Sequence, residues 1–221
     1  RQRQMCIRDS RSLVQGIWKG SGYGNHGGTT YERGMVYERQ LIKENKTMSY
    51  KRLIPCIFIY KGKAIKWFDD KEVVSDDVIG LAKQYCDKGA DELIVFDLSN
   101  TDDEHDEAID LMKKVNRAIS IPMVAGGNVR RQEDVKKILY TGAKRAILNF
   151  SKPLSFELIE EVSKRFGKER IAVSLNDFDA LFKQQHLIDK FSSEIIFMHR
   201  LDLLSVMNIT EIPCVVLTDT M

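Results

Sequence analysis

The sequence predicts an α/β fold of the TIM-type (βα)8 barrel, truncated after about seven strands, and three observations support this prediction. First, short apolar runs alternate with segments of helical periodicity from residue 48 onward. Second, the apolar runs contain few polar positions, which is typical of parallel strands buried on both faces. Third, short motifs recur along the chain, which favours repeated βα units over a doubly wound sheet.

The first half of the predicted barrel contains three strands and three helices. The strands are runs of β-branched and other apolar residues at 53–59, 92–98 and 121–125. The helices have apolar residues at intervals of three and four, and they span 76–86, 107–118 and 132–140. Gly89 and Gly142 follow the first and third helices, where a glycine commonly ends a helix.

The second half continues the alternation. Strands are expected at 145–150, 171–175, 194–198 and 212–217, and helices at 155–166, 179–191 and 203–207. Ser155 is the expected N-cap of its helix, and Gly167 follows the end of that helix. Because no eighth βα unit follows, we expect the first and seventh strands to have open edges.

Two internal similarities support the repeated units. The motif Gly-Ala followed by an apolar strand occurs at 89–96 and again at 142–149. Ile-Pro opens three of the expected strands, at 54–55, 121–122 and 212–213. A proline at the first position of a strand removes no hydrogen bond from the centre of the sheet.

Residues 1–47 differ from the rest of the chain. They hold half of the glycines and carry a net charge of +5, against −3 for residues 48–221. Residues 1–9 resemble translated sequencing-adapter sequence. Lys43-Glu44 can be encoded by a ribosome-binding sequence at a normal distance before Met48. We therefore expect residues 1–47 to be disordered or non-native, and residues 48–221 to form the barrel domain.

The composition excludes several classes of protein. The chain is 43% hydrophobic without any apolar run long enough to span a membrane, so no membrane association is expected. A net charge of +2 argues against a dedicated nucleic-acid binder. The four cysteines lack metal-ligand spacing, so we expect no metal site and no cofactor, and we expect a reducing, cytoplasmic location.

Functional residues of such a barrel lie at the carboxyl ends of its strands. The candidates there are Phe58, Asp97, Gly126, Gly127, Asn128, Asn149, Phe150, Asn176, Asp177, His199, Arg200, Thr218 and Asp219. Gly126 and Gly127 allow close approach of a ligand to the backbone and, with Asn149, suit one phosphate. A tight strand-to-helix turn with a capping asparagine explains the same residues, and both interpretations remain open.

Four side chains, two of them among these candidates, have a functional and a structural interpretation. Asp97 can act as a base or cap the following turn. Lys66 can contact an anion or simply be exposed. His105 lies in an acidic run, where we expect a solvated helix start rather than a metal site. His199 is the best-placed histidine for catalysis, although no nucleophile or partner acid can be assigned to it.

The recurring motifs resemble the histidine-biosynthesis barrels, in particular the cyclase subunit of imidazole glycerol phosphate synthase and its sister isomerase. The resemblance rests on residues 51–56, 89–93, 96–97, 121–122, 126–127, 130, 133–135, 142–143 and 149, and it is good over 48–175. It implies catalytic aspartates at the ends of strands one and five, where this chain has Phe58 and Asn176. Asparagine lacks the acid–base capacity of aspartate, and phenylalanine cannot transfer a proton.

The resemblance also implies which site residues remain. Asp97 and Lys66 are retained, whereas Asn128 replaces the third glycine of the family's phosphate loop. Part of one phosphate site is therefore expected at Gly126, Gly127, Asn128 and Asn149. The second phosphate site is expected to be lost, because His199–Asp202 and Thr218-Asp219 replace its motifs.

At the opposite end of the strands, the family carries a ring of alternating charges that gates ammonia entry. The matching positions here are Arg52, Glu92, Arg145 and Glu194, and all four signs agree. The resemblance therefore predicts a charge ring at the bottom of the barrel. Paired charges that merely close this end are the alternative that we favour.

A second resemblance concerns residues 50–58, 66–70 and 197–202. They are similar to the N-terminal extension of bifunctional proteins with phosphoribosyl-AMP cyclohydrolase and phosphoribosyl-ATP diphosphatase domains. This implies a non-catalytic barrel domain whose hydrolase domains lie beyond Met221. An active cyclase-type lyase or isomerase and a regulatory module that senses a phosphoribosyl metabolite are the alternatives.

Overall fold

The computed structural model describes residues 5–8, 52–152, 154–176, 178–198 and 212–218. All of these residues belong to one compact unit of the chain. No helix among them is both long enough and apolar enough to cross a membrane.

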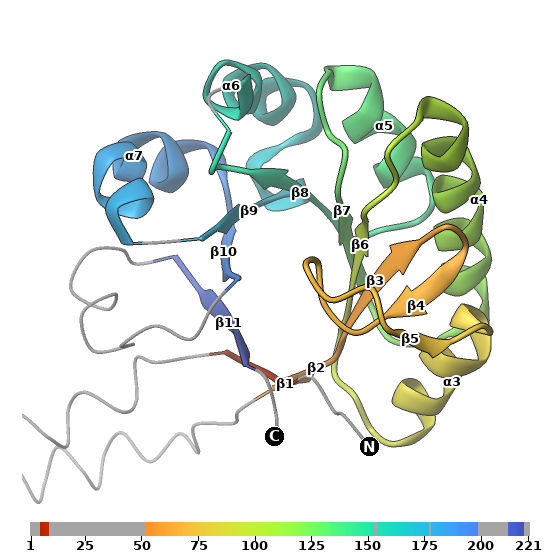
Figure 1. The fold of residues 1–221 in the computed structure, drawn as a ribbon. Coiled ribbons are helices and arrows are strands. Elements are labelled where there is room, and N and C mark those ends of the chain that lie inside the picture. Colours follow the sequence, from red (N-terminus) through yellow and green to blue (C-terminus); the bar gives the residue numbers. More distant parts are fainter. Residues whose placement is uncertain (1–4, 9–51, 153, 177, 199–211, 219–221) are drawn as a thin grey trace, which may run out of the picture. The chain divides into compact units, whose positions relative to one another are not determined.

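Seven parallel strands form the body of the sheet in the described residues. They are β3 (Cys56–Tyr60), β6 (Leu93–Asp97), β7 (Met123–Gly126), β8 (Arg145–Asn149), β9 (Ile171–Leu175), β10 (Glu194–Phe197) and β11 (Cys214–Thr218). Each pairs with the next in chain order, and the sheet curves as in a barrel (Figure 1). This confirms the predicted α/β barrel class.

Helices connect the parallel strands and lie on the outer face of the sheet (Figure 1). They are α3 (Val78–Asp87), α4 (Asp102–Ala118), α5 (Gln132–Tyr140), α6 (Leu154–Phe166) and α7 (Phe178–Phe191), with a short 3-10 helix, η1, at Lys168–Arg170. The predicted bounds of α5 and β9 are confirmed. Ser155 lies inside α6 rather than before it, so its prediction as the N-cap was wrong.

Helix α4 begins one turn earlier than predicted. Thr101 is its N-cap, and the side-chain oxygen of Thr101 accepts a hydrogen bond from the backbone N–H of Glu104. The first turn contains three acidic residues, which the positive end of the helix dipole favours. Apolar periodicity could not predict this turn, because its first residues are polar.

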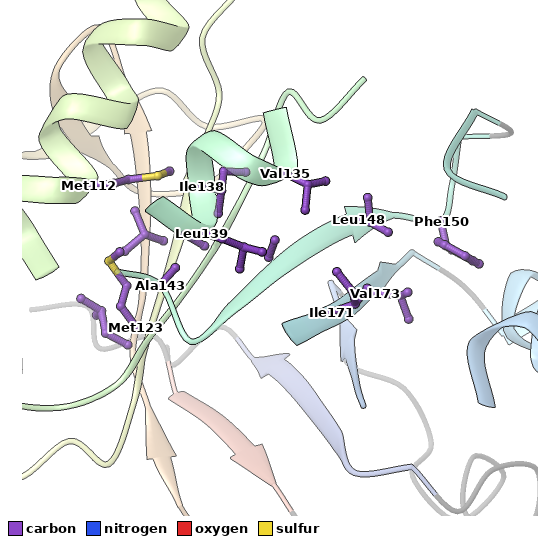
Figure 2. Close-up of a cluster of buried hydrophobic side chains, with 14 of the residues drawn as sticks. Met112, Met123, Val135, Ile138, Leu139, Ala143, Leu148, Phe150, Ile171 and Val173 are labelled. Carbon is purple, nitrogen blue, oxygen red and sulfur yellow. The ribbon is translucent and has the colours of Figure 1, made fainter. Parts of the chain in front are cut away.

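The apolar side chains form two layers. An outer cluster lies between the helices and the sheet, and Figure 2 shows part of it, including Met112 of α4, Ile138 of α5 and Leu148 of β8. An inner cluster fills the space enclosed by the strands and includes Ile54, Phe58 and Val215. Burial on both faces explains why the strands are apolar at nearly every position.

Two short strands after β3 were not predicted. They are β4 (Lys63–Ile65) and β5 (Val73–Ser75), and they form an antiparallel hairpin extension at one end of the sheet. The turn from β3 to β4 uses Lys61 and Gly62, both with positive φ. The loop between β4 and β5 carries aromatic side chains to the barrel mouth.

The other end of the sheet contains β2 (Leu53–Ile54) and β1 (Met5–Arg8). Pro55 separates β2 from β3, so the two are segments of one strand. β1 lies between β2 and β11 and is antiparallel to both. The edges of strands one and seven, which we expected to be open, are therefore paired with β1. The expected helix at 203–207 and the remainder of residues 1–47 lie outside the described residues.

Candidate functional site

A cavity of about 350 Å³ opens at the carboxyl ends of the parallel strands. Six of the residues singled out in the sequence line it, namely Phe58, Asp97, Gly127, Asn128, Asn149 and Asn176. They come together because the carboxyl ends of parallel strands meet at the same edge of the sheet. Gly126 and Lys66 are not among the lining residues.

Asp97, at the end of β6, is the centre of a buried polar cluster and is 2% exposed. Its Oδ1 accepts a hydrogen bond from the backbone N–H of Ser99 at 2.8 Å. Its Oδ2 accepts from the Ser99 hydroxyl at 3.0 Å and from the Asn128 amide at 3.2 Å. Both carboxylate oxygens are thus engaged within the protein, and the turn-capping role foreseen for Asp97 is present.

His105 completes this cluster, and the expectation that it lies on a solvated face was wrong. It is 7% exposed, and its Nδ1 lies 2.6 Å from Oδ2 of Asp97. A carboxylate accepts hydrogen bonds, so Nδ1 carries the proton toward Asp97. The signal was available, because His105 stands three residues before Ala108, which lies on the buried face of α4.

The predicted phosphate loop follows β7 and is shaped by backbone packing. Gly127 has a φ of +101°, and a Cβ there would collide with the carbonyl oxygen of Asp97. The Asn128 amide donates to the carbonyl and hydroxyl oxygens of Ser99, at 2.6 and 2.7 Å. Asn149 accepts a hydrogen bond from the backbone N–H of Ser151 at 2.9 Å. These contacts favour the tight-turn interpretation of the loop.

Lys66 lies outside the cavity and has acidic partners of its own. Its ammonium group is 3.0 Å from Asp70 and 3.2 Å from Glu72. Hydrogen bonds to these two carboxylates raise the pKa of Lys66. The cations that do line the cavity are Lys71 and Lys152. Neither was predicted, because each is an exposed lysine in a loop without a motif.

Phe58 occupies the end of the first strand, and it is fully buried among aromatic rings. Its ring stacks on Phe96 at 5.6 Å between centroids with an interplanar angle of 12°. Trp67 and Phe68, from the loop between β4 and β5, contact it edge-on at 5.2 and 6.5 Å. We call Phe58, Phe96, Trp67 and Phe68 the aromatic cluster.

The four charged residues at the amino ends of the strands also come together, and we call them the charge ring. Arg145 donates to Glu194, with its Nη2 2.7 Å from Oε2, and lies 3.5 Å from Glu92. Arg52 lies 3.1 Å from Glu92 and 3.5 Å from Glu194. Arg145 and both glutamates are at least nine-tenths buried, so the charges alternate around a closed, largely dry ring.

Among the remaining candidates, Phe150 is described and does not line the cavity. Phe150 is buried in the outer cluster, where its ring lies 5.1 Å from that of Phe156. Asp177, His199, Arg200 and Asp219 lie outside the described residues, as does the side chain of Thr218. Within the described ranges, no three His, Cys, Asp or Glu side chains gather so that they could hold a metal ion.

The order of the parallel strands, the outer helices and the cavity at the carboxyl ends of the strands define an α/β barrel of the TIM type. The chain belongs to the family of histidine biosynthesis proteins, whose model matches residues 52–213.

Several relatives are proteins named imidazole glycerol phosphate synthase subunit HisF. The relative from Flavobacterium psychrophilum is 35% identical over 132 residues, which make up 58% of this chain and 52% of that protein. The relative from Exiguobacterium sibiricum is 32% identical over 130 residues, 58% of this chain and 52% of that protein. The relative from Methanococcus maripaludis is 34% identical over 130 residues, 58% of this chain and 48% of that protein. The chain thus spans about half the length of these relatives.

Proposed function

We propose that the chain is a catalytically degenerate histidine-biosynthesis barrel, and that it is one domain of a longer protein whose other part hydrolyses phosphoribosyl-ATP and phosphoribosyl-AMP. The observation that carries the first half of the proposal is the position and burial of Phe58. It stands at the end of strand one, where the family resemblance implies a catalytic aspartate, and it is fully buried in the aromatic cluster.

The other side chains in the cavity do not supply the missing chemistry. General acid–base catalysis requires a group that gains and loses a proton near neutral pH. Asn176 cannot do so, and Asp97 is the carboxylate among the residues that line the cavity. Its oxygens already accept hydrogen bonds from Ser99, Asn128 and His105, which leaves it poorly placed to take a proton from a ligand.

The second half of the proposal rests on the three segments that resemble the extension of the bifunctional enzymes. Two of these segments meet in the aromatic cluster, because Trp67 and Phe68 of one pack against Phe58 of the other. Phe58, which stands in place of one of the two family aspartates, therefore forms one packed unit with side chains of the second segment. Such a unit favours a structural role for the aromatic cluster at the barrel mouth.

A turnover assay tests the degenerate state. The purified chain is incubated with the phosphoribosyl aminoimidazole substrate of the cyclase, with a HisF relative as the positive control. We expect no turnover above the background rate. Turnover that Asp97→Ala abolishes would contradict the proposal and favour an active cyclase-type lyase or isomerase.

The DNA downstream of the Met221 codon tests the parent protein. The proposal expects an open reading frame that continues into cyclohydrolase and diphosphatase domains. A stop codon directly after Met221 would contradict it and leave the first half of the proposal untouched.

A second candidate function is sensing of a phosphoribosyl metabolite, which the cavity itself favours. Its volume suits a small ligand, and Lys71 and Lys152 place two cations at its wall. Titration calorimetry with phosphoribosyl metabolites tests this candidate, with Lys152→Ala expected to weaken binding. No heat of binding with any such metabolite would exclude it.

A further inference from the structure

The cavity at the carboxyl ends of the strands has an aromatic half and a polar half. The aromatic half is formed by Phe58 of β3 and Phe96 of β6, which lie in register, and by Phe68 from the loop between β4 and β5. The polar half is formed by the ends of β7, β8 and β9. A ligand that fills the cavity therefore contacts aromatic rings on one side and hydrogen-bonding groups on the other.

Three polar side chains of the second half lie at the same level of the barrel wall. Asn149 of β8 is in register with Ser174 of β9. Gly126 of β7 is in register with Ile147 of β8, and Asn128 and Asn149 each lie two residues further along the chain. Asn128, Asn149 and Ser174 all line the cavity, and we call them the polar row. Neighbouring strands are about 5 Å apart, so one small ligand can reach adjacent members of the row.

Hydrogen bonds fix the carboxamide of Asn128 so that its oxygen is left open to the cavity. Its Nδ2 lies 2.6 Å from the carbonyl oxygen of Ser99, which can only accept, so the nitrogen faces Ser99. Nδ2 also donates to the hydroxyl of Ser99 and to Asp97. Oδ1 of Asn128 has no hydrogen-bond partner in the part of the chain that the structure describes, and it remains accessible. Asn128 therefore offers a ligand an acceptor.

The carboxamide of Asn149 has the opposite orientation. The backbone N–H of Ser151 donates to its Oδ1 at 2.9 Å, so Nδ2 is the atom left without a partner among the described residues. The hydroxyl of Ser174 has no partner there either. Ser174 is only 4% exposed, so the cavity is where its hydroxyl can find a partner. The polar row therefore offers an acceptor, a donor and an unpaired hydroxyl, in that order.

This order suits the edge of a planar heterocycle better than a phosphate. The terminal oxygens of a phosphate accept hydrogen bonds, so the open oxygen of Asn128 would repel them. A nucleobase carries an N–H beside an acceptor atom. The N–H can donate to Asn128, and the acceptor can receive a hydrogen bond from Asn149. Nucleobases also stack on aromatic side chains, which the ring of Phe68 provides on the other side of the cavity.

We propose that the cavity binds a nucleoside monophosphate through its base, with the base between Phe68 and the polar row. The phosphate then lies toward the loops that carry Lys71 and Lys152, the two cations of the cavity wall. This proposal rests on the second candidate function, in which the cavity holds a phosphoribosyl metabolite. It names the part of that metabolite that the polar row recognises.

Titration calorimetry on the full chain tests recognition of the base. Adenosine monophosphate (AMP) is the probe, because the amino group of adenine stands beside a ring nitrogen that accepts. Ribose phosphate lacks the base, and AMP with a dimethylated amino group lacks the donor. We expect each of these two controls to bind at least about tenfold more weakly than AMP.

The failures of this proposal and of metabolite sensing can be told apart. Ribose phosphate that binds as tightly as AMP would overturn recognition of the base and leave sensing of a phosphoribosyl metabolite intact. If neither AMP nor any other phosphoribosyl metabolite binds, both are overturned. The degenerate state of the barrel would still stand, because the turnover assay tests it separately.

Asn149→Asp reverses one member of the polar row. The carboxylate keeps an oxygen for the N–H of Ser151 but puts an acceptor in place of the donor Nδ2. Two acceptors suit guanine, whose ring N–H and amino group are adjacent donors. We therefore expect the affinity for AMP, relative to that for guanosine monophosphate, to fall at least about tenfold.

Asn100→Asp is the matched control, because it adds the same charge elsewhere in the cavity wall. It should weaken both nucleotides alike through repulsion of their phosphates, and so leave their ratio unchanged. An unchanged ratio in Asn149→Asp, or an equal fall in both variants, would overturn the proposal. If Asn149→Asp fails to fold, the comparison of AMP with its two controls on the unmodified chain still decides.

Discussion

The two ends of the barrel differ in the kinds of side chain that they bury. At the amino ends of the strands, the charge ring keeps four ionised side chains in contact. At the carboxyl ends, Phe58 of the aromatic cluster stands where the family resemblance implies a carboxylate. The amino ends are therefore ionic, whereas the carboxyl end of strand one is aromatic.

The difference has a physical reason. Removal of one member of a buried ion pair leaves an uncompensated charge in a dry site, so the ring resists change one residue at a time. A lone carboxylate at the mouth has no ionic partner. Its replacement therefore leaves no buried charge uncompensated. An aromatic residue can replace it once neighbours such as Trp67 and Phe68 cover the new ring. Selection for structure is therefore expected to preserve the charge ring, whereas only selection for catalysis preserves a carboxylate at the end of strand one.

The largest effect is expected at the charge ring. Glu194→Gln keeps the shape of the side chain but leaves Arg145 without its closest anionic partner, 2.7 Å away. We expect a loss of about 3–5 kcal/mol in the free energy of unfolding, measured by denaturant titration. Glu160→Gln, which removes an exposed ion pair with Lys164, is the control and should leave stability unchanged within error. Equal losses in both variants would mean that the ring is not a dry, structural unit.

The next effect is expected in the aromatic cluster. Phe58→Leu preserves apolar character but removes the stack on Phe96 and the edge contact with Trp67. A loss of about 1–3 kcal/mol is expected from the ring contacts and the change of shape. Phe182→Leu is the control, because Phe182 is 71% exposed and should change stability by no more than about 0.5 kcal/mol. A tolerated Phe58→Leu would show that the mouth is loosely packed.

A smaller effect separates the buried from the solvated interpretation of His105. His105→Ala removes one hydrogen-bond partner of Asp97, and we expect a loss of about 1–2 kcal/mol in unfolding free energy. Glu107→Ala, at an exposed position of the same helix, serves as the comparison. If the two substitutions had equal effects in thermal unfolding, His105 would lie on the solvated face after all.

The smallest effect is a pH-dependent change in the loop that carries Trp67. The hydrogen bond from Lys66 lowers the pKa of Asp70 below its ordinary value of 3.8. Because the pKa of Asp70 is lower in the folded loop, its ionised carboxylate stabilises the loop at pH values above the ordinary pKa. This stabilisation is lost as the pH falls through the lowered pKa of Asp70. Trp67 fluorescence in a Trp18→Phe background should therefore shift below about pH 4. The shift should be absent in Asp70→Asn, and persistence there would assign it to another group.

Much of the fold could be predicted from the sequence, because alternation of apolar strands and amphipathic helices is a local pattern. The bounds of α5 and β9 followed directly from it. The β4–β5 hairpin could not be predicted, because Val73 and Val74 are half exposed and the strands are too short to show a period. β1 was not predicted, because it lies in the segment that we expected to be disordered or non-native, and one strand of four residues shows no period.

The site was predicted to a lesser degree. Residues at strand ends, such as Asp97 and Asn128, could be placed together because barrel topology brings strand ends to one rim. The members of the charge ring, at the opposite rim, were predicted from the family resemblance rather than from the topology alone. The contact between Phe58 and Trp67 depends on the path of a loop, which the sequence pattern does not specify.

The most direct test of this account is the substitution Phe58→Asp combined with Asn176→Asp, with unfolding free energy and turnover measured on the same preparation. Burial of a carboxylate in the aromatic cluster without a partner should destabilise the barrel by at least about 3 kcal/mol and restore no turnover of the cyclase substrate. If the doubly substituted chain were as stable as the original and turned over the substrate, the account would be contradicted. The mouth would then lack only the two aspartates of a working active site.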